Sequence, residues 1–324
     1  MKFEIIIDRP EKGKNDEYIR SSIFHVIPKI ADDFNLNLKG LTQIIITQSL
    51  EKQLHKISDM NGINKITYTN EVDVKTIGKF LCIRNKNDHE IFIFLNYYEV
   101  EKHLFSQEES TREFLAHVIH HELAHIHDIN QKITFKKKEN FEKLTTDKLR
   151  YIYPLVENCW SEYYANFLSQ PTATEKNYNF YISLFMNELK KSQDNFSKDI
   201  IRFRIHGDID KLLDDFNRRG SLLIRLASYN IGYIDGLNTK IDFYCKELYE
   251  QLKQSCFCDI FLDLSNALST IRKSYPSCDD ELKLFIPLIE VVEKYFNLSG
   301  LFFSKTMEDK IYISVPISKD TVPY

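Results

Sequence analysis

Residues 114–130 read FLAHVIHHELAHIHDIN, and they hold five of the ten histidines in the chain. Within this stretch His121 and His125 are four residues apart, which places them one turn apart on the same face of a helix. Two imidazoles at this spacing can converge on one Zn²⁺ at roughly 2.0–2.1 Å. Glu122 is offset by one residue, so it would flank the metal without binding it. A base needs this position to take a proton from the attacking water.

A catalytic zinc needs three protein ligands and one open position. We predict Glu162 as the third ligand, in the segment WSEYYAN at 160–166, 37 residues beyond His125. Ala165 leaves space for another helix to approach. Asn166, one turn after Glu162, could accept a hydrogen bond from the far nitrogen of a ligand histidine and so hold its ring. Glu157 is the competing ligand, but it lacks this pairing with a small residue and an acceptor.

Other polar residues of the histidine-rich helix have simpler explanations. We expect His120 and His127 on the surface, and His117 either in the core or on the surface. Asp128, three residues beyond His125, is either a further acceptor for a ligand histidine or a surface residue at the helix end. Ser110 with Glu113 predicts the helix start, because the pair fits a capping box, and the helix should run to about Asp128.

The remainder of the chain predicts an α+β protein. Apolar and β-branched runs predict strands before residue 100, with helices interleaved. The run Ile91–Leu95 predicts either an exposed strand that binds an extended peptide or a buried central strand. Helix patterns dominate beyond residue 106. Prolines set two helix boundaries: the helix that begins at residue 16 should end or bend at Pro28, and another should open at Tyr153-Pro154 and close at Pro171. The expected strands are 3–8, 41–47, 66–69, 77–83 and 91–95, with a hairpin at 301–317. The expected helices are 16–27, 50–57, 110–128, 153–171, 177–192, 208–236, 240–254, 258–272 and 280–297.

Composition excludes several classes of protein. The 324 residues carry a net charge of -4, which argues against a nucleic-acid-binding protein, and 43% hydrophobic residues argue against disorder. No apolar run approaches the roughly 18 residues of a membrane span. Six cysteines at irregular spacing predict reduced thiols rather than disulfides, so we expect a cytoplasmic protein. The lysine-rich segment 132–143 is expected to be solvated.

The segment HELAH at 121–125, followed by EYYAN at 162–166, resembles the gluzincin metallopeptidases. Within that group it is similar to the ImmA/IrrE-type peptidases, whose pattern also includes an apolar strand ending in Asn, here 91–96, and an entry such as Arg112-Glu113-Phe114. The resemblance covers about 90–170. It implies a zincin-like mixed sheet with an active-site helix in residues 1–171, followed by a mainly helical region of unknown role in residues 172–324.

The sequence therefore predicts a zinc metallopeptidase with one Zn²⁺ per chain, acting on a peptide or protein substrate in regulatory intracellular proteolysis. A metal-stabilised regulatory or interaction protein is one alternative, although a structural zinc would not need Glu122. A toxin or defence component that is silent until a signal arrives is another. The oligomeric state and the substrate stay open. Candidate donors to the transition-state oxyanion are Tyr163, Tyr164, His206, Tyr229 and Tyr233.

Overall fold

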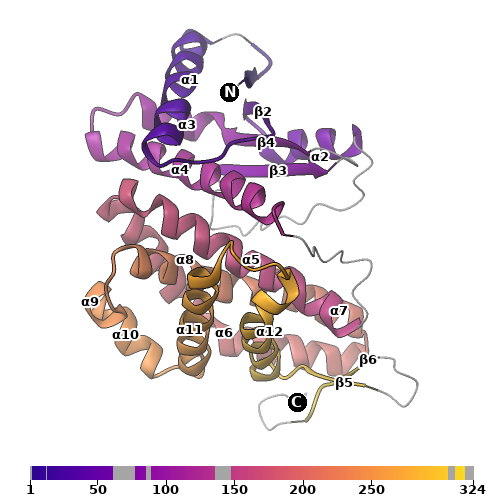
Figure 1. The fold of residues 1–324 in the computed structure, drawn as a ribbon. Helices are drawn as coiled ribbons and strands as arrows, with labels where there is room; N and C mark the ends of the chain where they lie inside the picture. The colour runs from indigo at the N-terminus through magenta and orange to yellow at the C-terminus, as the bar shows by residue number, and fades with distance from the viewer. Residues whose placement is uncertain are drawn as a thin grey trace. The chain divides into compact units, whose positions relative to one another are not determined.

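A computed structural model of the chain describes residues 2–11, 13–60, 77–84, 89–135, 147–305 and 311–317. It is a mixed α/β structure with a small mixed sheet and a helical C-terminal region (Figure 1). None of the described helices combines the length and the apolar composition that a membrane span requires. The expected strand 66–69 and most of the lysine-rich segment lie outside the described residues. The chain divides into two compact units: unit 1 is Met1–Gln131 with Leu168–Asn177, and unit 2 is Lys132–Phe167 with Tyr178–Tyr324.

Unit 1 contains a four-stranded sheet in the order β1-β2-β4-β3. β1, β2 and β4 are parallel, whereas β3 runs antiparallel to β4. The strands are rich in isoleucine and phenylalanine, which favour extended backbone because their side chains fit a pleated, buried surface. The strands predicted at 3–8, 41–47, 77–83 and 91–95 are confirmed. Their bounds are β1 (Glu4–Asp8), β2 (Leu41–Thr47), β3 (Gly78–Arg84) and β4 (His89–Asn96).

β4 lies inside the sheet, and this excludes one of the two predictions for the run 91–95. Ile93 pairs with Ile44 of β2 on one side and with Phe80 of β3 on the other. The continuous apolar run therefore marks a central strand, buried on both faces, and a peptide has no free edge of β4 to bind. Among the described strands, β3 is an edge strand, with β4 on one side only.

The two faces of the sheet are covered by different helices. Ile91, Ile93 and Leu95 of β4 face α1, α3 and α4, whereas Phe92 and Phe94 face the side of α2. The alternation follows from the strand period of two. Full burial of each such side chain contributes roughly 1.5–3 kcal/mol, so both faces contribute to stability. The helices are α1 (Asp16–Asp33), α2 (Leu50–Met60), α3 (Tyr97–Leu104) and α4 (Glu109–Lys132).

Several helix ends differ from the predictions. α1 runs through Pro28, and α5 (Asp147–Ser169) runs through Pro154 instead of beginning there. An interior proline costs a helix roughly 3 kcal/mol, which burial on both sides of it can offset. In α5, Ile152 and Val156, which flank Pro154, are fully buried. α4 begins at Glu109, so Ser110 does not cap it.

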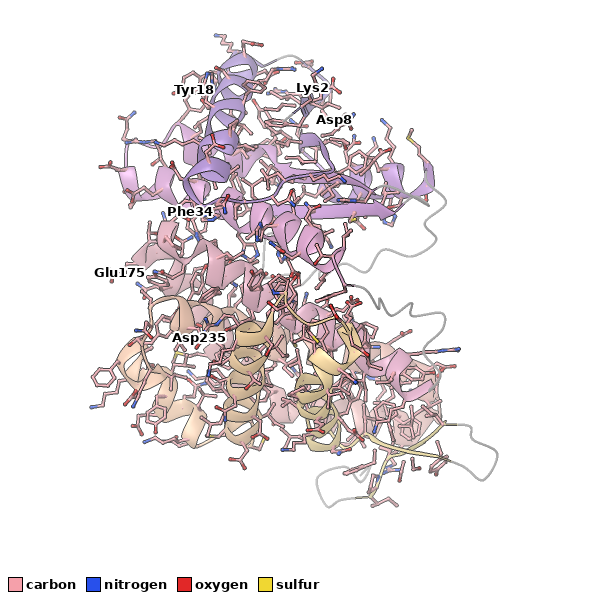
Figure 2. The ribbon with its side chains drawn as sticks, viewed as in Figure 1. Lys2, Asp8, Tyr18, Phe34, Glu175 and Asp235 are labelled. Carbon is pink, nitrogen blue, oxygen red and sulfur yellow. The ribbon has the colours of Figure 1, made fainter. Side chains whose placement is uncertain are left out.

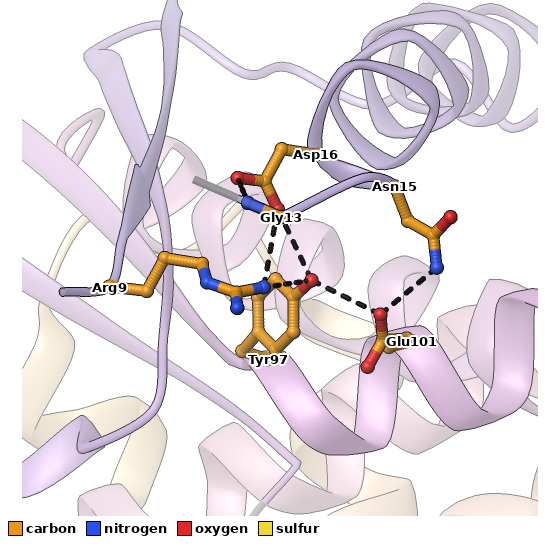
Figure 3. A network of polar contacts seen from close by, with 6 residues as sticks. All are labelled: Arg9, Gly13, Asn15, Asp16, Tyr97 and Glu101. Carbon is orange, nitrogen blue, oxygen red and sulfur yellow. Dashed lines mark hydrogen bonds and ion pairs between the residues drawn. The ribbon is translucent and has the colours of Figure 1, made fainter. Parts of the chain in front are cut away.

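A polar network ties the end of β1 to the starts of α1 and α3 (Figure 3). Arg9 Nη1 donates to the hydroxyl of Tyr97 at 2.6 Å and forms an ion pair with Asp16 at 3.5 Å. The same hydroxyl lies 3.2 Å from a carboxylate oxygen of Asp16 and 3.2 Å from one of Glu101. Asp16 also accepts from the main-chain N–H of Gly13 at 2.7 Å. The network fixes where α1 begins.

Unit 2 is helical (Figure 2). Aromatic side chains fill much of its core. The ring of Trp160 stacks on Tyr164, with centroids 5.1 Å apart. Gly232 lets α8 approach α5 closely, since a Cβ at this position would lie 2.5 Å from the main-chain oxygen of Tyr163. The predicted hairpin is confirmed as an antiparallel pair. The other elements are α6 (Glu175–His206), α7 (Ile209–Asp215), α8 (Ser221–Gly236), α9 (Ile241–Tyr244), α10 (Lys246–Lys253), α11 (Cys258–Ser274), α12 (Glu281–Leu298), β5 (Phe302–Lys305) and β6 (Ile311–Ser314).

Candidate metal centre

The predicted histidine pair is brought together on α4, in unit 1. The Nε2 atoms of His121 and His125 lie 3.0 Å apart, and both side chains are buried. Two nitrogens at 2.05 Å from a tetrahedral Zn²⁺ would be separated by about 3.3 Å, which follows from the usual bond length and angle. The spacing of the two Nε2 atoms therefore fits one ion with little adjustment. Neutral imidazole nitrogens are the ligands that zinc prefers, together with carboxylates and thiolates.

Glu122 is also buried, and it lies against β3. A Cβ built on Gly78 would come within 2.9 Å of Glu122 Oε1 and 3.0 Å of its Cγ. The edge strand therefore approaches the proposed base at the one residue of β3 that has no side chain. Gly78 was not predicted from the sequence, because an isolated glycine in a strand does not indicate which residue it contacts.

Phe80, two residues beyond Gly78 on β3, contacts His125 of α4. Its ring lies 4.7 Å from the imidazole of His125, centroid to centroid, with 31° between the ring planes. Sequence reasoning missed this contact too. The period of two along the strand would have placed Phe80 and Gly78 on one face, but not beside α4.

His117 and His120 are buried, so the surface position predicted for His120 is wrong. His117 Nδ1 lies 3.2 Å from the carbonyl oxygen of Ser169, which can only accept, so this nitrogen carries the proton. The hydroxyl of Thr172 donates to the same carbonyl at 2.9 Å and accepts from His120 Nδ1 at 3.0 Å. Burial, assisted by repulsion from His121, lowers the pKa of both His117 and His120 to about 3, so both are neutral. They join α4 to the end of α5 within unit 1.

His127 and Asp128 lie further along α4. Nδ1 of His127 accepts from the main-chain N–H of Asn37 at 2.9 Å, and the residue is partly exposed. Burial lowers the pKa of His127, and the nearby carboxylate of Asp128 opposes this effect. Asp128 is buried, and α4 continues to Lys132, so Asp128 is not a surface residue at the helix end. Its bond to a ligand histidine stays a prediction.

Glu162 and Asn166 lie one turn apart on α5, in unit 2. Asn166 is fully buried, so it does not face solvent. Its Nδ2 donates to the main-chain oxygen of Glu162 at 3.0 Å, while its Oδ1 has no hydrogen-bond partner among the described residues. The bond between this oxygen and a ligand histidine stays a prediction. Glu162 is half-buried and accepts a hydrogen bond from the hydroxyl of Tyr229.

Tyr229, one of the five candidate oxyanion donors, bonds the predicted ligand Glu162. Burial, the negative charge of Glu162 and this hydrogen bond raise the pKa of Tyr229 well above its usual value. The hydroxyl of Tyr163 instead donates to Asp235 at 2.6 Å and accepts from Arg272 at 2.8 Å. The remaining three are otherwise placed: Tyr164 stacks on Trp160, Tyr233 is fully buried, and His206 is exposed at the end of α6.

No protein-family model matches the chain, and comparisons with curated proteins and with solved structures found no match either. The gluzincin resemblance of HELAH and EYYAN stays a prediction.

Proposed function

We propose that the chain is a zinc-dependent metallopeptidase, in which His121, His125 and Glu162 bind one Zn²⁺ and Glu122 is the general base. The observation that carries the proposal is the histidine pair, whose Nε2 atoms lie 3.0 Å apart on one buried face of α4. Glu122 adds to it, because a purely structural metal site would have no use for a buried carboxylate between its two histidines.

Glu162 is proposed as the third ligand because a carboxylate beside two histidines is an established ligand set for a catalytic zinc. Its place on α5 supports this choice. Nδ1 of His117 on α4 donates to the carbonyl oxygen of Ser169, the last residue of α5, within unit 1. Glu162 lies on the same helix as Ser169, about two turns before it.

When bound, the zinc would act as a Lewis acid toward water and the scissile carbonyl. In this scheme, Glu122 takes a proton from the attacking water and returns it to the nitrogen of the leaving amine. His121 and His125 are buried side chains of one helix, which favours a fixed ligand geometry between turnovers. The proposed fold is zincin-like, with α4 as the active-site helix.

The substrate would bind along β3 rather than along β4, which is paired on both sides. An extended peptide would add to the edge of β3 through main-chain hydrogen bonds. Because Gly78 of β3 lies against Glu122, a peptide bound there would pass the proposed base.

The test is the variant Glu122→Gln, compared with Glu113→Gln, which changes an exposed glutamate of the same helix. Both proteins are loaded with zinc and incubated with a library of quenched fluorescent peptides. Glu122→Gln should keep zinc and fold but lose hydrolysis by about 10²–10⁴-fold, the usual contribution of a general base. Glu113→Gln should match the wild type. Hydrolysis by Glu122→Gln at the wild-type rate would exclude Glu122 as the base, and zinc-loaded wild type without any hydrolysis would favour a structural metal.

A further inference from the structure

One face of β3 contacts two residues of the proposed site. Gly78 and Phe80 are two residues apart, so they lie on the same face of the strand. Gly78 faces the carboxylate of Glu122, and Phe80 faces the ring of His125. The strand is fixed by its ladder with β4, in which Gly78 pairs with Leu95 and Phe80 with Ile93.

The Glu122 side chain occupies the space that a side chain at residue 78 would need. An added Cβ would lie 2.9 Å from Oε1, 3.0 Å from Cγ and 3.2 Å from Cδ, and all three atoms are in the Glu122 side chain. Because the main chain of β3 is held by the ladder, the flexible carboxylate would move instead. A methyl group at residue 78 should therefore displace the proposed base at little cost to the fold.

At Phe80 the contact restricts a ring. The centroid of the phenyl ring lies 4.7 Å from that of the His125 imidazole, and the two ring planes are tilted by 31°. An imidazole covered on one side by a fixed aromatic ring has fewer orientations available. A smaller apolar side chain at residue 80 would remove this restriction on the His125 ring, and a ligand that must be ordered on binding holds its metal less tightly.

We propose that Gly78 and Phe80 are positioning residues of the site, which hold the Glu122 carboxylate and the His125 ring in their working orientations. This inference rests on the proposed function. It assigns two separable effects to one strand: Phe80 acts on metal affinity through His125, and Gly78 acts on proton transfer through Glu122.

The first experiment measures zinc affinity by competition with a fluorescent chelator for the wild type, Phe80→Leu, Phe80→Tyr, Gly78→Ala and Lys79→Ala. Lys79 is the control, because it lies on the opposite face of β3. Phe80→Leu should weaken zinc binding by about ten-fold, the lower end of losses from residues that orient a ligand, and Phe80→Tyr should restore it. Gly78→Ala and Lys79→Ala should bind zinc like the wild type. Equal affinity for Phe80→Leu and the wild type would overturn the role of Phe80.

The second experiment separates Gly78. Peptide hydrolysis by Gly78→Ala should fall by ten-fold or more at unchanged zinc content, while Glu113→Gln keeps the wild-type rate. Urea unfolding of the metal-free proteins is measured as well. Gly78→Ala should shift the urea midpoint less in a Glu122→Ala background than in the wild type, because the Glu122 side chain that collides with the new methyl group is then absent. Full hydrolysis by Gly78→Ala, or equal shifts in both backgrounds, would overturn its role. A wild type that neither binds zinc nor hydrolyses peptide refutes the proposed function and this inference together, whereas an active wild type matched by every variant refutes this inference alone.

Discussion

The hydroxyl of Tyr97 is the centre of the network in Figure 3, so Tyr97→Phe is a specific test of how unit 1 is held together. The variant keeps the ring and therefore the cation–π contact with Arg9, whose guanidinium carbon lies 4.6 Å from the ring centroid. It removes the bond from Arg9 at 2.6 Å and the bond to either Asp16 or Glu101, since the hydroxyl has one proton and both carboxylates lie at 3.2 Å. Two bonds to charged partners are lost.

A hydrogen bond to a charged group contributes roughly 1.5–3 kcal/mol. The full sum overstates the cost, because Arg9 and Asp16 keep each other at 3.5 Å and Asp16 keeps the N–H of Gly13 at 2.7 Å. We therefore expect Tyr97→Phe to lower the free energy of unfolding by about 2–3 kcal/mol. The assay is urea unfolding at neutral pH. Tyr98→Phe is the control, because Tyr98 is the next residue of α3 and is 55% exposed. Equal stability of the two variants would refute the reasoning.

The same network has a signature at high pH. Burial, the charge of Glu101 and the bonds to Asp16 and Glu101 raise the pKa of Tyr97 from 10.0 to about 12, while Arg9 opposes the shift. A group with a raised folded pKa stabilises the protein fully below its unfolded pKa and loses that effect as the pH rises through the folded one. The stability gap between the wild type and Tyr97→Phe should therefore shrink between pH 10 and 12. A gap that stays constant over this range would contradict the proposed proton at Tyr97.

Two further predictions concern the junction of α4 with the end of α5. Thr172→Val should lower the free energy of unfolding by about 1–3 kcal/mol, because it leaves the buried Nδ1–H of His120 without an acceptor, whereas Thr172→Ser should cost much less; equal losses in urea unfolding would exclude the hydroxyl as the cause. Because the pKa of His117 is lowered from 6.5 to about 3, its neutral form stabilises the fold above pH 6.5, and this effect is lost as the pH falls from 6.5 toward 3. His117→Asn keeps a donor but does not titrate, so its stability should fall less steeply over that range; parallel pH curves for the two proteins would contradict this account.

Local patterns in the sequence predicted most individual elements. Runs of isoleucine and phenylalanine marked β1, β2 and β4, because such runs have few alternatives to a buried strand. The position of β4 inside the sheet depends on its pairing with β2 and β3, which no pattern within Ile91–Leu95 contains. The helix start predicted at Pro154 is wrong for a related reason, and α1 likewise does not end at Pro28. A local rule ends a helix at proline, but burial of the flanking turns in α1 and α5 overrides it.

In the candidate site, too, local geometry was predictable from the sequence and tertiary contacts were not. The pairing of His121 with His125 follows from helix geometry alone, and the structure brings the two nitrogens together. The burial of His120 depends on Phe34, whose ring stacks on it with centroids 4.2 Å apart. Phe34 lies at the end of α1, far away in the sequence, so no pattern within α4 could predict the contact. The contact of Gly78 with Glu122 is likewise tertiary.

The zinc content of purified protein tests the central claim most directly. Wild type and His121→Ala are exchanged into buffer with a slight excess of zinc, desalted and measured by mass spectrometry of the metal. The account predicts about one equivalent of zinc per chain in the wild type and almost none in His121→Ala, since two remaining ligands hold zinc weakly. Full zinc occupancy in His121→Ala, or a folded wild type that retains no zinc, would contradict it.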